Sequence, residues 1–301
     1  MSYVGRHVHF WDVLFCGSFS SRKWVYHTIP YQSAPKAYCS YHIRHVSNIN
    51  NMTREQQWVV EDWSPRPPLT AAPSVEGRHV RLDPLDVTTD VPLLWQALGG
   101  HNGTINDLVY WWGVGELRTE ADLATLLREQ IEQPGGVVNV IRLLPSRQLA
   151  GMASYIQTRP AHGVTECGFV VHGDALRQTV AATEAHYLLA SHVLDTLQYR
   201  RYEWKCDSLN APSNRAAQRY GFTYEGTFRQ VVVTARGHNR DTNWYAMVDK
   251  DWPRIKAAWE AWLDPSNFER NGQTLLQKRK LQEFHDMYKN KKNNFRATKD
   301  S

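Results

Sequence analysis

Cysteine is scarce in this 301-residue chain, which has four, and no two of them are spaced for a shared site. Cys16, Cys39, Cys167 and Cys206 fit neither a zinc motif nor the dense disulfide framework of a small secreted domain. Free cysteines are typical of a reducing compartment. We therefore predict a cytoplasmic protein.

Long apolar runs and repeats are missing as well. No stretch reaches the roughly eighteen apolar residues that a membrane-spanning helix requires, so we expect no membrane insertion. The first apolar stretch, residues 9–19, is interrupted by Asp12 and lacks the basic start and small-residue cleavage site of a secretory signal. The absence of an internal repeat excludes a solenoid.

The middle of the chain also lacks positive charge. The whole sequence has a net charge of +5, but residues 1–51 hold five basic and one acidic side chain, and residues 274–301 hold eight and three. Residues 52–273 therefore hold 22 basic and 26 acidic side chains, a net charge of −4. The basic isoelectric point is thus no evidence of a nucleic-acid-binding core, and we expect no nucleic-acid partner there.

Apolar residues make up 42% of the chain and charged residues 22%, which is enough apolar material for a globular core. Residues 1–51 show no helical or strand periodicity and are predicted to be a poorly ordered extension. The histidines in it lack helical metal-ligand spacing, and we expect no bound metal. Residues 52–76 contain a proline-rich run typical of a linker. The domain is predicted to span 77–263, and 264–301 to form a basic, partly helical tail.

Hydrophobic periodicity divides the predicted domain into strands and helices. The strand patterns cover 80–84, 137–144, 149–157, 164–172, 201–207, 228–235 and 243–249. The helix patterns cover 91–99, 121–131, 181–197, 213–220 and 252–263. Three successive strands followed by helix–strand–helix indicate a mixed α/β (α+β) domain with a central, mostly antiparallel sheet flanked by helices.

The strand that begins near Glu166 leads through a short loop into a helix that opens near Ala181. The N–H groups at a helix start carry partial positive charge and bind anions. Arg177, just before this helix, can add a charge-assisted hydrogen bond to a phosphate. An arginine at a helix start is also common on surfaces that bind nothing.

The next strand is followed by a more specific pattern. Asn210 and Ser213 open a helix that ends at Gly221, as helices commonly do. Asparagine and serine are also ordinary capping residues, and we expect Ser213 to cap the helix whether or not it has a chemical role. The full pattern is Asn210, Ser213, Gly221-Phe222 and Glu225-Gly226.

This pattern resembles the GCN5-related N-acetyltransferases (GNAT superfamily), and within them the branch around the ribosomal-protein acetyltransferases RimJ and RimL. The resemblance covers about residues 77–263. It is carried by Gly168, Arg177, Thr183-Glu184-Ala185, Asn210, Ser213, Gly221-Phe222 and Glu225-Gly226.

The resemblance implies a GNAT fold in which acetyl-CoA, the co-substrate, binds where two strands splay apart. Pantetheine would pair with the backbone of Phe169, Val170 and Val171. The phosphates and the reacting end would meet Arg177, Gln178, Thr179, Val180, Ala181, Ala182, Asn210 and Ser213. The implied enzyme is an acetyl-CoA-dependent N-acetyltransferase in which a primary amine attacks the thioester directly.

Three positions depart from the family pattern. Val180 stands where a glycine lets the backbone approach phosphate closely. Ala217 replaces a tyrosine acid, which leaves the hydroxyl of Ser213 as the candidate proton donor to the departing thiolate. Val232 stands where the RimL-like branch has a glutamate base, so Glu166, on the central strand, is our candidate base.

The acceptor end of the site is less specific. Our candidate acceptor-binding residues are Tyr110, Trp111, Trp112, Arg240 and Asp241, although the aromatic residues equally suit a core and the last two an ion pair. The acceptor is either a protein N-terminal amine or a small-molecule amine. The oligomeric state is left open.

Two alternatives belong to other functional classes. Val180 could weaken the CoA site and leave a non-catalytic binding module with a GNAT-like fold. The basic flanks could also recruit RNA, ribosomes or membranes and carry the enzyme to them.

Overall fold

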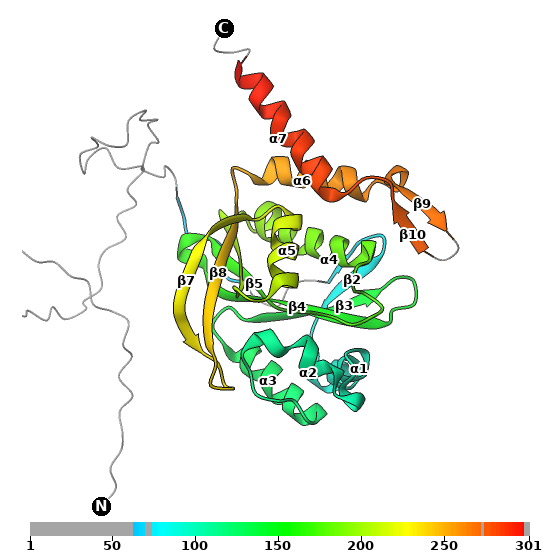
Figure 1. Ribbon diagram of the computed structural model, residues 1–301, viewed down its shortest axis with the longest axis vertical. Coiled ribbons are helices and arrows are strands. Elements are labelled where there is room, and N and C mark those ends of the chain that lie inside the picture. The colour runs from blue at the N-terminus through cyan, green and yellow to red at the C-terminus, as the bar shows by residue number, and fades with distance from the viewer. Residues whose placement is uncertain (1–62, 70–73, 272–273, 298–301) are drawn as a thin grey trace, which may run out of the picture. The chain divides into compact units, whose positions relative to one another are not determined.

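The computed structural model describes residues 63–69, 74–271 and 274–297 (Figure 1). The chain divides into two units, 1–63 and 64–301, and the second carries the fold described below. The predicted extension, residues 1–51, lies outside the described residues.

One eight-stranded sheet forms the centre of this unit, in the order β1-β2-β3-β4-β5-β6-β8-β7. Neighbouring strands are antiparallel except β5 and β6, which run parallel. The predicted mixed α/β class with a mostly antiparallel sheet is confirmed. The strands are β1 (Val75–Glu76), β2 (Val80–Pro84), β3 (Val137–Leu143), β4 (Leu149–Arg159), β5 (Val164–His172), β6 (Arg201–Asp207), β7 (Thr223–Val233) and β8 (Asn239–Val248).

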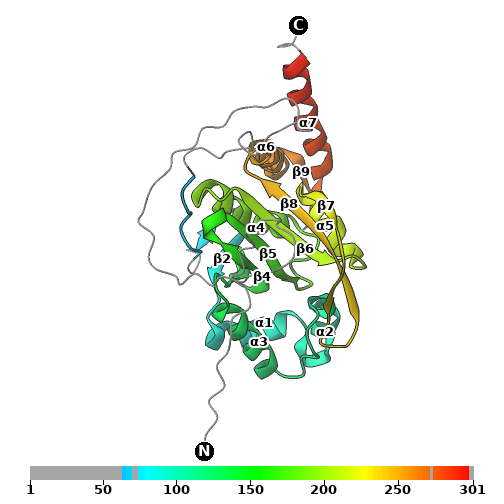
Figure 2. The same cartoon turned by 90° about the vertical axis from the view of Figure 1, so that its left-hand side faces the viewer.

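Helices cover both faces of the sheet (Figures 1 and 2). One face packs against α1 (Val87–Ala97), α2 (Thr104–Leu108) and α3 (Glu120–Glu132), and the other against α4 (Val180–Ser191), α5 (Ala211–Tyr220) and α6 (Trp252–Leu263). Each face has its own apolar core, so the sheet is buried on both sides where the helices cross it.

Hydrogen bonds of the Glu184 side chain link α4 to the start of β2. Its buried carboxylate accepts hydrogen bonds from the backbone N–H groups of Arg78, His79 and Val80 at 2.9, 2.6 and 3.1 Å. A Cβ at Gly77 would lie 2.6 Å from the carboxyl carbon, so only glycine leaves room for this contact. A residue that carried the family resemblance therefore has a structural role.

The C-terminal segment is more structured than the predicted tail. A hairpin of β9 (Phe268–Asn271) and β10 (Thr274–Gln277) precedes a helix, α7 (Leu281–Ala297). Leu281 and Phe284 of α7 are buried in the same core as α6. The hairpin was not predicted because its apolar residues are few and do not alternate as in a half-buried strand.

Part of the predicted linker also contacts the domain. Leu69 is buried, and the hydroxyl of Tyr199 donates to the carbonyl of Pro67 at 2.7 Å. None of the helices within the described ranges is long and apolar enough to cross a membrane.

Candidate active site

The two parallel strands separate at the centre of the sheet. β5 and β6 pair from Val164 opposite Arg201 as far as Cys167 opposite Trp204. Beyond that point β5 remains paired with β4, with one extra residue between Gly168 and Val171, and Phe169 has a positive φ of 48°. Such a bulge bends a strand. The ends of β5 and β6 therefore diverge, as the resemblance implied.

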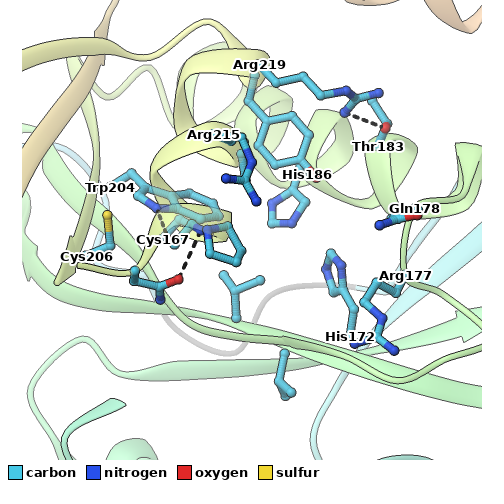
Figure 3. A pocket seen from close by; sticks show the side chains of 18 of the residues that line it. Cys167, His172, Arg177, Gln178, Thr183, His186, Trp204, Cys206, Arg215 and Arg219 are labelled. Atoms are coloured by element: carbon cyan, nitrogen blue, oxygen red, sulfur yellow. Dashed lines mark hydrogen bonds between the residues drawn. The ribbon is translucent and has the colours of Figure 1, made fainter. Parts of the chain in front are cut away.

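A cavity of about 1330 Å³ occupies this divergence (Figure 3). Its walls come from the end of α2 and the turn that follows it, the ends of β5 and β6, the starts of α4 and α5, the end of α6, and the C-terminal hairpin. Among the predicted residues, those that line it are Trp111, Trp112, Glu166, Phe169, Val170, Val171, Arg177, Gln178, Thr179, Val180, Ala182, Asn210, Ser213 and Arg240.

The start of α4 forms one wall. Thr179 is the N-cap, and its Oγ1 accepts from the N–H of Ala182 at 3.1 Å. The N–H groups of Val180 and Ala181 come before any intrahelical acceptor and have no other bond within the described part of the chain. Arg177, just outside the helix, forms an exposed ion pair with Asp174. This wall can bind an anion through the helix dipole and free N–H groups.

Val180 does not distort this loop. It is the first residue of α4, and its half-buried side chain packs against the core that includes α4 and α6. The left-handed residue of the loop is Gln178, with a φ of 62°. The conformational freedom of glycine is therefore not required at position 180.

The start of α5 forms the opposite wall. The helix begins at Ala211, and its N-cap is Asn210, whose Oδ1 accepts from the N–H of Ser213 at 3.1 Å. The prediction that Ser213 caps this helix is wrong, because the helix starts two residues before it. The Ser213 hydroxyl instead accepts from the indole Nε1 of Trp204 at 3.0 Å, which leaves its own proton available to another acceptor.

Glu166 belongs to a buried charge cluster. Its Oε2 lies 2.6 Å from Nζ of Lys205, which is also 2.9 Å from Oε2 of Glu203. Burial raises the pKa of the Glu166 carboxyl, against the opposing effect of the Lys205 ammonium. The sequence analysis missed Lys205 and Glu203. The sequence shows that Glu203 and Lys205 lie two residues apart and hence on one face of a strand. It does not show that Glu166 is their neighbour, because this depends on the parallel register that pairs Glu166 with Glu203.

Aromatic residues and Arg240, which were predicted to bind the acceptor, form one end of the cavity. The ring of Trp112 packs edge-on against Phe169, with centroids 5.0 Å apart. Arg240 donates from Nε to Thr242 Oγ1 at 3.1 Å and from Nη1 to the carbonyl of Trp111 at 3.3 Å. Arg240 thereby joins β8 to the segment Tyr110–Trp112, the aromatic loop.

Two predicted acceptor residues lie elsewhere. Tyr110 lines a separate, smaller cavity, where the guanidinium of Arg236 lies 5.0 Å from its ring centroid. Asp241 accepts from the N–H of Gln230 at 2.7 Å and from Asn239 at 2.9 Å. Of these two residues, neither lines the larger cavity, and among the described residues Asp241 forms no ion pair with Arg240.

The two cysteines of the described chain are poorly suited to act as nucleophiles. Both are free and buried, and burial raises the pKa of Cys167 to about 12 and that of Cys206 to about 11. Thiols with such pKa values are poor nucleophiles at neutral pH. We find no cluster of three or more His, Cys, Asp or Glu side chains suited to a metal within the described ranges.

A histidine pair was also missed. His172 at the end of β5 and His186 in α4 line the cavity with ring centroids 5.4 Å apart (Figure 3). The Nε2 atom of each is buried without a hydrogen bond. Burial lowers the pKa of His172 to about 4 and that of His186 well below its usual range. Both are therefore neutral near pH 7.

Comparison with known proteins shows similarity over much of the chain. Residues 80–223 match a family described as the acetyltransferase (GNAT) domain. A GCN5-related N-acetyltransferase from Brucella melitensis is 38% identical with a TM-score of 0.69, over 75% of this chain and 99% of that one. A probable acetyltransferase (GNAT family) from Chromobacterium violaceum is 34% identical with a TM-score of 0.60, over 69% and 100%. No curated protein matches.

A third structure is more distant. It is an acetyl transferase from Salmonella typhimurium that modifies the N-terminal serine of a 50S ribosomal subunit protein. It is 20% identical with a TM-score of 0.49, over 57% of this chain and 96% of that one. Similarity this low carries no information about the acceptor of the present chain.

Proposed function

Because this chain belongs to the GNAT acetyltransferases, we propose that it transfers an acetyl group from acetyl-CoA to a primary amine by direct attack on the thioester. The observation that carries the proposal is the cavity where β5 and β6 diverge. It has free helix N–H groups on one wall and the Ser213 hydroxyl on the other.

Binding of acetyl-CoA in this cavity is supported by its two polar walls. The edge of β5 at Phe169, Val170 and Val171 has no β6 partner, so its backbone can pair with the amides of pantetheine. The diphosphate would lie on the N–H groups of the loop from Arg177 to Ala182. The half-buried side chain of Val180 packs against the core at the first turn of α4 without distorting it, and we therefore favour the enzyme over a non-catalytic binding module.

Ser213 would protonate the departing sulfur. As the amine nitrogen forms its bond to the acetyl carbon, the C–S bond breaks and CoA leaves as a thiolate. The indole N–H of Trp204 occupies a lone pair of the Ser213 oxygen, which orients the hydroxyl proton away from Trp204 and stabilises negative charge on the oxygen. Ser213 would recover its proton from water.

Glu166 would accept the proton that the acceptor ammonium loses before attack, directly or through a water molecule. Its raised pKa makes the carboxylate a stronger base than an exposed one. Lys205 holds the carboxylate in place and neutralises part of the charge that it shares with Glu203. Lys205 is thus a positioning residue.

The acceptor would enter past Trp111, Trp112 and Arg240. Tyr110 and Asp241 would contact only an acceptor that extends beyond the cavity, such as a polypeptide. The RimJ/RimL-like motifs support a protein N-terminal amine, and the aromatic wall supports a small amine. Mass spectrometry of acetylated products separates the two classes.

Ser213→Ala tests the mechanism. We expect kcat to fall by about 100-fold or more, as for loss of a general acid, while KM for acetyl-CoA changes little. The measurement is thiol release with an accepted amine. Ser208→Ala is the matched control, because Ser208 lies in the preceding loop outside the cavity wall, and it should keep normal turnover. An unchanged kcat in Ser213→Ala would remove Ser213 from the reaction.

A further inference from the structure

The cavity extends beyond the residues that the chemistry uses. At the end away from the aromatic loop, the wall comes from α5, the end of α6 and the C-terminal hairpin. This part of the wall consists of two arginine side chains and a mainly apolar surface. The residues are Arg215, Arg219, Trp262, Phe268, Leu275, Leu276 and Gln277.

Arg219 is a half-buried cation without a counter-ion. Its Nη1 donates to Thr183 Oγ1 at 3.0 Å, and its guanidinium carbon lies 5.1 Å from the ring centroid of Trp262. No ion pair joins it to a carboxylate within the described chain. A charge removed from water without a partner is costly, so a bound anion would stabilise this arrangement.

The position of Arg219 suggests which anion binds. Thr183 is the fourth residue of α4, so Arg219 lies beside the helix start where the diphosphate is proposed to bind. Arg215, four residues earlier on α5, lines the same cavity, and both side chains extend from that helix in Figure 3. This end of the cavity therefore offers guanidinium groups to a further phosphate, in addition to the diphosphate that the loop would bind.

The hairpin supplies an apolar wall next to these arginines. The indole Nε1 of Trp262 donates to Oε1 of Gln277 at 2.9 Å, and Phe268 packs edge-on against Trp262 at 5.1 Å. These contacts hold β9 and β10 against α6. Leu276 lines the cavity but is 49% exposed, so an apolar surface lies open beside the cationic one. An aromatic base with an attached phosphate matches this pair of surfaces.

We propose that α5 and the C-terminal hairpin bind the nucleotide half of the co-substrate, with Arg219 on the ribose 3′-phosphate and the adenine against the hairpin's apolar wall. This inference rests on the proposed use of acetyl-CoA. Phe268, Leu275, Leu276 and Gln277 are then part of the co-substrate site.

The test uses the full chain and calorimetric titration of CoA and 3′-dephospho-CoA. Wild type should bind CoA about 10-fold or more tightly than dephospho-CoA, the effect expected of one charge-assisted phosphate contact. Arg219→Gln should bind both ligands with the affinity that wild type has for dephospho-CoA. Arg128→Gln, on the opposite face of the sheet, should behave as wild type.

A second variant tests the apolar wall. Leu276→Ala, at a position that is 49% exposed, should weaken the binding of CoA roughly fivefold and leave that of 4′-phosphopantetheine unchanged. Equal losses of affinity for CoA and phosphopantetheine in Leu276→Ala would overturn the assignment of the hairpin.

An Arg219→Gln protein that retains the wild-type preference for CoA over dephospho-CoA would overturn the assignment of the 3′-phosphate. If wild type binds phosphopantetheine but shows no gain from the nucleotide, this inference fails alone. If it binds no ligand, the proposed function fails with it.

Discussion

Burial holds the pKa of three histidines of this domain far below the ordinary value. Burial lowers the pKa of His172 and His285 to about 4 and that of His186 further. His186 and His285 are at most 4% exposed, and both ring nitrogens of His285 lack a hydrogen bond. No nearby carboxylate stabilises a protonated ring enough to offset burial. Each histidine is therefore neutral in the folded state near pH 7.

These groups should make the fold sensitive to mild acid. Because their folded-state pKa values lie below the ordinary value near 6.5, the unfolded chain takes up protons first as the pH falls. The contribution of these histidines to the free energy of unfolding should be fully present above about pH 6.5 and should decline as the pH falls towards 4. For His285 alone the loss between pH 7.5 and 5 is roughly 2 kcal/mol. Urea unfolding at the two pH values measures it.

The control for this prediction is His285→Gln, which cannot titrate. Its unfolding free energy should depend less on pH than that of wild type. Carboxylates with lowered pKa values, such as Asp83 and Asp122, lose their contribution only below about pH 4, outside this window. Equal stability of wild type at pH 7.5 and pH 5 would contradict the account.

Single residues also show the limit of sequence-based prediction. Asn210 and Ser213 were found because their spacing along the chain reflects one local turn. The role of Ser213 within that turn was misassigned, since the helix starts two residues earlier. Lys205 and Trp204 could not be assigned, because their partners Glu166 and Ser213 come from other elements.

At the level of elements, α5 depends on its terminal glycine. Gly221 follows the last helical residue with a φ of 91°, in the left-handed region that other residues avoid. A Cβ there would lie 2.8 Å from Cε1 of His285 in α7 and 3.3 Å from Cγ2 of Ile255 in α6. The glycine therefore ends the helix and allows α6 and α7 to pack against it.

Gly221→Ala should lower the free energy of unfolding by about 1–3 kcal/mol, the sum of backbone strain and a steric contact. Gly237→Ala is the matched control, because Gly237 has a φ of 77° but no atom within 4 Å of its added Cβ. It should lose only the backbone part, about 1 kcal/mol. Urea unfolding of both variants compares them, and equal losses would exclude the contact with His285.

The strands and helices with strong periodicity were predicted well. β5, β6 and α6 have the predicted boundaries, because apolar alternation or a helical stripe continues to their ends. β7 starts at Thr223, five residues earlier than predicted, because its exposed polar residues pair with β8 without an alternation of their own. The predicted helix 181–197 ends at Ser191, and residues 192–196 form a wider π-type turn.

At the scale of the whole molecule, the sequence predicted the fold class and the two segments that meet at the cavity. Each segment is a local strand–loop–helix unit, and their meeting follows from the parallel pairing of β5 and β6. The charge cluster and the C-terminal wall require contacts between elements far apart in the chain. Trp262, for example, meets Arg219 only because α6 and α5 pack on the same face.

The central claim is that the cavity between β5 and β6 binds acetyl-CoA. Calorimetric titration of acetyl-CoA into the full chain tests it most directly. The account predicts one-to-one binding with a micromolar dissociation constant and a matching rise in the melting temperature at saturating ligand. A folded chain that gives neither binding heat nor a change in melting temperature would contradict the assignment of the cavity and the proposed reaction.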